Sequence, residues 1–229
     1  EILQFIFYPR RDFTNECSLP NATNRFILVE DDVSIGCRFY FHDQKSPNIL
    51  YFHGNGEVVS DYDHVAPFYN QKNINLFVVD YRGYGFSDGT PTCTDMISDA
   101  HKIFKSFLHM LKEKGHTGSI FIMGRSLGSI SAIELAYHYQ DQVKGMIIES
   151  GLANILEVFE NIGFPVKSLD IQEEPSFSNL IKIGSISIPT LIIHAEYDSL
   201  IPLKEARDLF DNVATSNKEI LIIPKADHN

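Results

Sequence analysis

The sequence predicts an α/β protein with a mostly parallel central sheet, helices on both faces of that sheet and an antiparallel hairpin near the N-terminus. Three observations predict this class. Two segments with alternating apolar residues come first, short continuous apolar runs recur after them, and segments of helical period lie between most of those runs. Continuous apolar runs are typical of strands buried on both faces, and strands that alternate with helices form parallel sheets.

The individual elements follow from the same patterns. The hairpin is predicted by Arg25–Glu30 and Val33–Phe41, where every second residue is apolar. Helices are expected over Thr94–Lys114 and Leu127–Tyr139, because each segment places its apolar residues on one stripe. Buried strands are expected at the runs Ile49–Phe52, Leu76–Val79, Ile120–Met123, Met146–Ile148, Leu191–Ile193 and Ile220–Ile223.

One segment breaks the alternation of strand and helix. Asn154–Ser187 holds aromatic residues and prolines but no clear strand, so we expect an excursion inserted between neighbouring strands. It is too short for a second domain and long enough for a lid, and we expect residues 1–229 to form a single domain with a lid at about 154–187. Its aromatic side chains either line a ligand pocket or only cover the sheet, among them Phe159, Phe164 and Phe177.

Composition limits the expected partners and location. The 229 residues carry a formal net charge of −11, which repels phosphate backbones and argues against nucleic acid as a partner. No apolar run approaches the roughly 20 residues that span a bilayer, and Glu1–Tyr8 lacks the pattern of a signal peptide. The first residue is Glu1 rather than Met, which indicates a processed chain or a fragment. The 3 cysteines, odd in number and far apart, indicate free thiols, so we expect a cytoplasmic protein without integral membrane association.

A candidate nucleophile lies in Gly124-Arg125-Ser126-Leu127-Gly128, which follows an expected strand directly and opens an expected helix. A nucleophile elbow requires this order of strand, sharp turn and helix, with glycines where side chains would collide. Ser126 is then exposed above the sheet as the nucleophile. The alternative is a glycine-rich turn in which this serine caps the helix.

A serine nucleophile needs a histidine base, and the histidine needs a carboxylate. His228 follows the last expected strand, and Asp198 lies in the loop after the preceding strand, so the order Ser126, Asp198, His228 is the one that accompanies an elbow. Asp198 could instead cap the helix near Pro202, and Glu149 is a competing carboxylate. His228 could be an ordinary surface histidine near the chain end. His194, at the end of a buried strand, fits a core residue better than the base.

The developing oxyanion needs hydrogen-bond donors. We expect the backbone N–H of Leu127 and that of Asn55, which lies in His53-Gly54-Asn55-Gly56 after an expected strand. The alternative for this tetrapeptide is a plain turn. Gly83, Gly85 and Gly89 miss the spacing of a dinucleotide fingerprint, and the sequence holds no Walker loop or metal-ligand motif, so we expect no cofactor and no metal.

From Ile49 to its end the chain resembles the α/β-hydrolase superfamily, and more narrowly the small serine hydrolases that include acyl-protein thioesterases and uncharacterised esterase relatives. The resemblance implies Ser126 as nucleophile, Asp198 as acid, His228 as base, and Asn55 and Leu127 as oxyanion donors. It rests on His53-Gly54-Asn55-Gly56, Asp80-Tyr81-Arg82-Gly83-Tyr84-Gly85, Gly124-Arg125-Ser126-Leu127-Gly128, Pro189–Asp198 and Ala226-Asp227-His228.

The function implied is a serine hydrolase that cleaves a carboxylic ester or thioester through an acyl-enzyme, acting on a small molecule or an acylated protein. Two alternatives stay open: a non-catalytic module that binds an acyl ligand, and a serine peptidase. Superfamily members usually continue past the histidine into a helix packed on the sheet, whereas this sequence stops at Asn229. Without such a helix we expect a loosely held histidine loop.

Overall fold

The computed structural model describes residues 6–12, 16–17 and 19–228. The chain divides into two compact units, residues 1–122 and 123–229, and the boundary falls within strand β5 (Ile120–Arg125). Residues 1–5, which begin the segment that lacks the pattern of a signal peptide, lie outside the described residues. Each unit has its own set of strands and helices.

The predicted hairpin is present in the first unit. Strand β1 (Ala22–Glu30) pairs antiparallel with β2 (Val33–Tyr40), and Ile27 lies opposite Ile35. Strand β2 then pairs antiparallel with β4 (Asn75–Val79), which runs parallel to β3 (Asn48–Phe52). The strand order is therefore β1-β2-β4-β3, and β2, which lies between β1 and β4, is buried from Ile35 to Tyr40.

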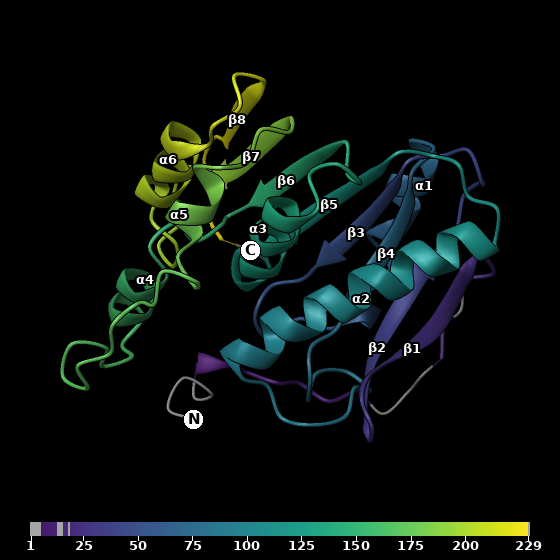
Figure 1. The fold of residues 1–229 in the computed structure, drawn as a ribbon, viewed down its shortest axis with the longest axis horizontal. Helices are drawn as coiled ribbons and strands as arrows, with labels where there is room; N and C mark the ends of the chain where they lie inside the picture. Colours follow the sequence, from purple (N-terminus) through teal and green to yellow (C-terminus); the bar gives the residue numbers. More distant parts are fainter. Residues whose placement is uncertain (1–5, 13–15, 18, 229) are drawn as a thin grey trace. The chain divides into compact units, whose positions relative to one another are not determined.

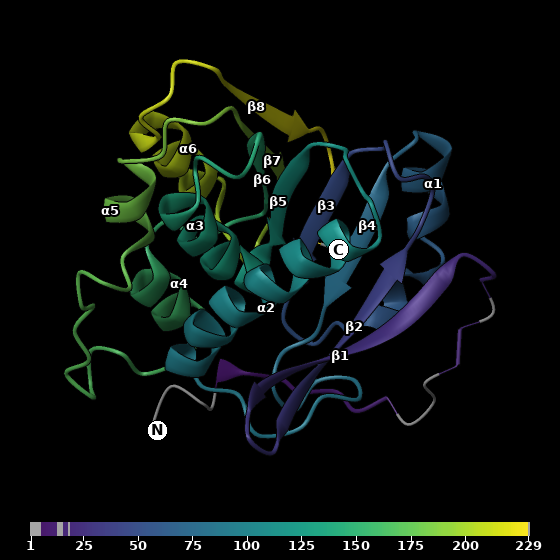
Figure 2. The same cartoon turned by 45° about the vertical axis from the view of Figure 1, so that its right-hand side comes forward.

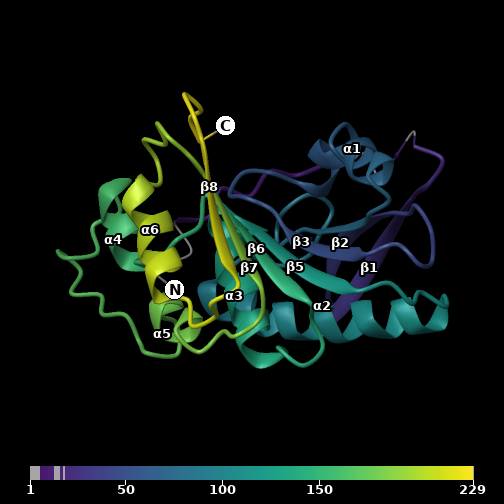
Figure 3. The same ribbon diagram turned by 90° about the horizontal axis from the view of Figure 1, so that it is seen from above.

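Helices cover both faces of these strands, as predicted. Figures 1 and 3 show α2 (Cys93–Glu113) along one face and α1 (Ala66–Gln71) on the other. The short helix η2 (Val59–Asp63) precedes α1 in the sequence. Helix α2 begins at Cys93 because the Thr92 hydroxyl accepts a hydrogen bond from the Asp95 N–H at 3.1 Å. A side-chain oxygen at this position satisfies an amide that has no partner within the helix.

The second unit consists of parallel strands connected by helices. Strand β6 (Gly145–Glu149) pairs with β7 (Thr190–Ala195), and β7 pairs with β8 (Lys218–Ile223). Figure 2 shows α3 and α6 beside these strands. The predicted fold class, a mostly parallel sheet with an antiparallel N-terminal hairpin and surrounding helices, is confirmed. The helices of this unit are α3 (Ser129–His138), α4 (Ile155–Asn161), α5 (Asn179–Ile183) and α6 (Leu203–Asn212).

The prediction that Ile220–Ile223 is buried on both faces is wrong. In β8 the side chains of Leu221 and Ile223 are 45% and 39% exposed. Strand β8 comes last in the strand order and pairs with β7 alone, so its apolar run is that of an edge strand. A continuous apolar run does not distinguish an edge strand from a central one, because both carry the same residue types.

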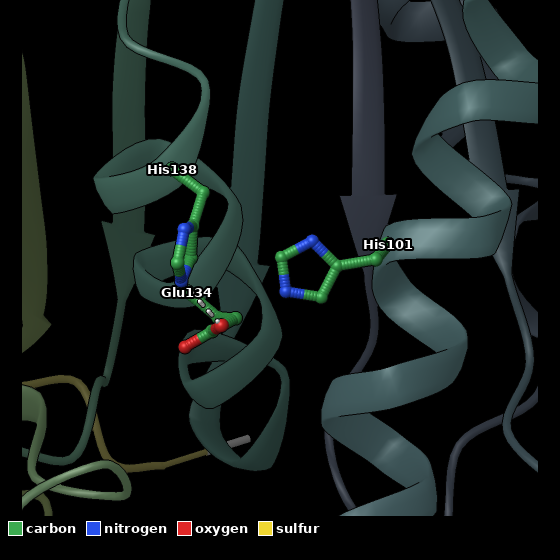
Figure 4. Close-up of side chains that lie close together, drawn as sticks. All are labelled: His101, Glu134 and His138. Atoms are coloured by element: carbon green, nitrogen blue, oxygen red, sulfur yellow. Dashed lines mark ion pairs between the residues drawn. The ribbon is translucent and has the colours of Figure 1, made fainter.

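The excursion between β6 and β7 contains α4 and α5. Helix α5 is anchored to α3 by an ion pair in which Lys182 Nζ lies 2.6 Å from Glu134 Oε2, with both side chains buried. His138, one turn after Glu134 on α3, lies 3.0 Å from the other carboxylate oxygen (Figure 4). Removing one partner of a buried ion pair leaves an uncompensated charge, so this pair fixes where α5 packs.

The start of α4 is held in a second way. The buried carboxylate of Glu205, on α6, accepts hydrogen bonds from the N–H groups of Ala153 and Asn154 at 2.9 and 2.7 Å. These amides immediately precede α4, where backbone N–H groups lack acceptors within the helix. No helix in the described part of the chain is long and apolar enough to cross a membrane.

Candidate active site

The predicted strand, turn and helix surround Ser126. Strand β5 ends at Arg125, Ser126 begins the short helix η3 (Ser126–Gly128), and α3 follows at once. Ser126 has a φ of 51°, a left-handed conformation that strains a residue other than glycine. A side chain at Gly124 would place its Cβ 2.4 Å from the Gly128 carbonyl oxygen, so the turn closes only with glycine there. These features are those of a nucleophile elbow.

The alternative of a helix-capping serine is wrong. The residues that precede η3 and α3 at the capping positions are Arg125 and Gly128, and neither makes a side-chain capping bond. The Ser126 backbone carbonyl instead accepts a hydrogen bond from the Ser129 hydroxyl at 2.6 Å. That hydroxyl also accepts from the Leu152 N–H at 3.1 Å, so it connects the elbow to the loop after β6.

Asp198 and His228 lie together. His228 Nδ1 and Asp198 Oδ2 are 2.7 Å apart, although 30 residues separate them in sequence. The Asp198 side chain is fully buried and that of His228 is 9% exposed. His228 is therefore not an ordinary surface histidine. With Nδ1 bound to the carboxylate, Nε2 is the ring nitrogen that can exchange a proton with a substrate or a nucleophile.

The second oxygen of Asp198 shapes its own loop. Oδ1 accepts hydrogen bonds from the N–H groups of Leu200 and Ile201 at 3.1 and 2.7 Å. Burial raises the pKa of Asp198, but the bonds from His228 and Ile201 outweigh burial, and the pKa lies below its usual value. The carboxylate therefore stays charged beside the imidazole. Pro202, not Asp198, occupies the capping position of α6, so the alternative role of Asp198 as a cap of that helix is wrong.

Glu149, the competing carboxylate, is engaged elsewhere. Its Oε1 lies 3.2 Å from Nε of Arg125. A second nitrogen of the same guanidinium donates to the backbone carbonyl of His228. Arg125 thus connects the elbow to the histidine loop, a contact that sequence reasoning missed because this residue is a variable position of the elbow motif.

His194 occupies the core, as expected. Its side chain is fully buried, its Nε2 lies 2.9 Å from the Ile201 carbonyl, and the same nitrogen is 3.7 Å from Asp198 Oδ2. A ring nitrogen bonded to a carbonyl oxygen carries the proton, so Nδ1 is unprotonated in the neutral ring. Burial lowers the pKa of His194 below its ordinary value. This histidine supports the Asp198 loop and is neutral in the folded protein.

The burial of His194 predicts acid sensitivity. Below about pH 6.5, the ordinary pKa of histidine, this residue binds a proton in the unfolded chain but stays neutral in the folded protein. The free energy of unfolding therefore falls by up to about 1.4 kcal/mol for each pH unit of acidification. The lowered pKa of Asp198 adds a loss only below about pH 4. We therefore expect the free energy of unfolding, measured by urea titration between pH 5 and 7, to change less steeply with pH in His194→Gln than in the wild type. Equal slopes would contradict this prediction.

The two predicted oxyanion donors lie in different units. Leu127, in the first turn of the helical segment after Ser126, has an amide without an intrahelical acceptor. In the first unit Asn55 holds its own loop, because its Oδ1 accepts from the Tyr8 N–H at 2.9 Å and its Nδ2 donates to the Ile6 carbonyl at 2.8 Å. The loop turns at Gly56, which has a φ of 79°. The roles of both amides as oxyanion donors stay predictions.

The comparison with known families agrees with this geometry. A family model described as "Serine aminopeptidase, S33" matches residues 43–167, more than half of the chain. The chain belongs to the serine aminopeptidase S33 family. This S33 chain is 28% identical over 194 residues to Protein bem46 of Schizosaccharomyces pombe. The aligned region covers 81% of this chain and 62% of bem46.

Two further proteins are similar to this S33 chain. Lysophosphatidylserine lipase ABHD12 of Rattus norvegicus is 28% identical to this chain over 239 residues. The aligned region covers 86% of this chain and 58% of the lipase. The esterase Pf2001 of Pyrococcus furiosus has the same fold, with a TM-score of 0.75, 18% identity, and coverage of 96% of this chain and 90% of the esterase. Together with the family model, these likenesses confirm the predicted α/β-hydrolase superfamily. The S33 chain spans 57% to 64% of the length of the first curated relatives that it matches.

Proposed function

We propose that this chain is a serine hydrolase that cleaves a carboxylic ester or thioester through an acyl-enzyme. One observation carries the proposal: the His228 imidazole is bonded to buried Asp198 at 2.7 Å, and its backbone is bonded to the residue that precedes Ser126. A histidine held by a carboxylate is the base that a serine hydroxyl needs. Membership of the S33 family supports hydrolysis as the reaction class.

In the proposed reaction the Ser126 hydroxyl oxygen attacks the substrate carbonyl while His228 Nε2 takes its proton. Asp198 stabilises the imidazolium, and the Leu127 N–H donates to the oxyanion, a contribution of about 3 to 4 kcal/mol per donor in such sites. His228 then gives the proton to the leaving alcohol or thiol, and water, activated by the same base, releases the acid from Ser126.

An ester of an acyl chain is the substrate we favour. The curated relative named a lysophosphatidylserine lipase acts, by its name, on a lipid that carries a carboxylic ester. The name of the family favours a second candidate, an amide of an amino acid. Acyl p-nitrophenyl esters, acyl thioesters and amino-acid p-nitroanilides, compared by kcat/KM, separate the two. The cytoplasmic location and the acylated protein as partner stay predictions.

A fluorophosphonate probe tests the nucleophile directly. The wild-type protein should be labelled covalently on Ser126, and Ser126→Ala should abolish labelling because no other hydroxyl occupies the elbow. Ser216→Ala, which removes an exposed hydroxyl in the same unit, should be labelled like the wild type. Labelling that persists undiminished in Ser126→Ala would overturn the proposal. A probe-negative wild type that is still stabilised by an acyl ligand in a thermal unfolding assay would favour the non-catalytic binding module.

A further inference from the structure

Arg125 occupies a position from which its side chain reaches two other parts of the candidate site. It is the last residue of β5 and directly precedes Ser126, and its side chain is 13% exposed. Its Nε lies 3.2 Å from Glu149 Oε1 at the end of β6, and a second guanidinium nitrogen donates to the His228 carbonyl. The end of β5, the end of β6 and the histidine are thereby joined.

Two further contacts of the histidine loop come from the loop after β7. The Tyr197 N–H donates to the Ala226 carbonyl at 2.9 Å, and the Glu196 carboxylate accepts from the Lys225 N–H at 2.8 Å. Asp198 holds the imidazole itself. These contacts fix the loop relative to Asp198, and the bond from Arg125 fixes it relative to the residue next to Ser126.

The distance between a nucleophile and its base depends on how the two loops that carry them are held. A displacement of about 1 Å from the reactive geometry costs on the order of a hundredfold in rate. A guanidinium suits the task of holding them, because its donors form a rigid planar fork that reaches two acceptors at once and it stays charged at every working pH. A lysine ammonium is a point charge on a flexible stem and cannot reproduce that fork.

We infer that Arg125 is a positioning residue that holds the His228 loop against the nucleophile elbow, with Glu149 orienting the guanidinium. This inference rests on the proposed function. It assigns no chemical step to Arg125, which acts through the placement of His228.

The inference predicts a defect in kcat that a guanidinium can repair. Arg125→Ala should lower kcat for an acyl p-nitrophenyl ester by about 10- to 100-fold and change KM by less than about threefold, since the base is misplaced while the substrate still binds. Millimolar ethylguanidinium should restore part of the lost kcat, whereas ethylammonium should not. Arg125→Lys should lie between Arg125→Ala and the wild type. Arg207→Ala, an exposed arginine on α6, serves as the matched control and should behave like the wild type.

A second readout does not require activity. Hydrogen exchange of the segment 224–228 should become about tenfold faster in Arg125→Ala and stay unchanged in Arg207→Ala, because a hydrogen bond from a charged donor is lost. An unchanged kcat, or a lower kcat with unchanged exchange in this segment, would overturn the inference. A wild type that the fluorophosphonate does not label, but whose loop still exchanges faster in Arg125→Ala, would refute the proposed function and retain the loop-holding role.

Discussion

Asp198→Asn should lower kcat for ester hydrolysis by about a thousand- to ten-thousandfold without unfolding the protein. The Asp198 carboxylate holds the proton on His228 Nδ1 through the 2.7 Å bond and stabilises the imidazolium that forms when His228 takes the proton of Ser126. An asparagine amide carries no charge, and its NH₂ group favours the wrong tautomer of the imidazole. Steady-state kinetics at pH 8, with the rate of fluorophosphonate labelling, measure the loss.

The fold should tolerate this substitution. Asparagine retains a side-chain oxygen for the N–H groups of Leu200 and Ile201, so the loop after β7 keeps its hydrogen bonds. Asp211→Asn, on the exposed surface of α6, is the matched control and should change kcat by less than about twofold. A kcat near the wild-type value in Asp198→Asn would show that another carboxylate serves His228.

The largest expected effect on stability lies in the first unit, at Asp63. Its two carboxylate oxygens lie 2.8 and 2.7 Å from one nitrogen of Arg38, whose side chain is completely buried, and Asp63 also accepts from the Tyr40 hydroxyl at 2.7 Å. Asp63→Ala would leave the guanidinium buried without its counter-charge. We expect the free energy of unfolding to fall by about 3 to 5 kcal/mol.

Urea titration of Asp63→Ala, followed by tyrosine fluorescence, measures this loss. The matched control is Glu113→Ala, because Glu113 forms an ion pair with His109 at 3.2 Å in which both side chains are exposed. Exposed pairs contribute up to about 1 kcal/mol, so the control should unfold close to the wild type. Equal losses in the two variants would show that burial does not determine the strength of the Arg38–Asp63 pair.

Most of the fold was predictable because its signals are local. Period-2 alternation located β1 and β2, and the stripe of apolar residues located α2 to within one residue at either end. The strand that pairs with the hairpin was not predictable. Strand β2 joins β4 rather than β3, which follows it in sequence, since pairing depends on how the chain returns between strands rather than on any single segment.

The residues of the candidate site also divide into those that the sequence identified and one that only the structure revealed. Ser126, Asp198 and His228 were singled out from motif and chain order alone, because an elbow imposes a local sequence of strand, turn and helix. Arg125 could not be identified in this way, since any residue type is compatible with its position in the motif. Its bond to the His228 carbonyl joins residues 103 positions apart and depends on where two separate loops end.

The amino-acid sequence by itself determined the order of strands and helices, the strained turn at Ser126 and the residues available for proton transfer. Only the tertiary structure decided that Asp198 rather than Glu149 meets His228, and that Glu149 instead orients Arg125. The physical reason is that backbone periodicity is encoded in neighbouring residues, whereas the direction of a charged side chain is decided by whichever donors and acceptors the folded loops bring within hydrogen-bond distance.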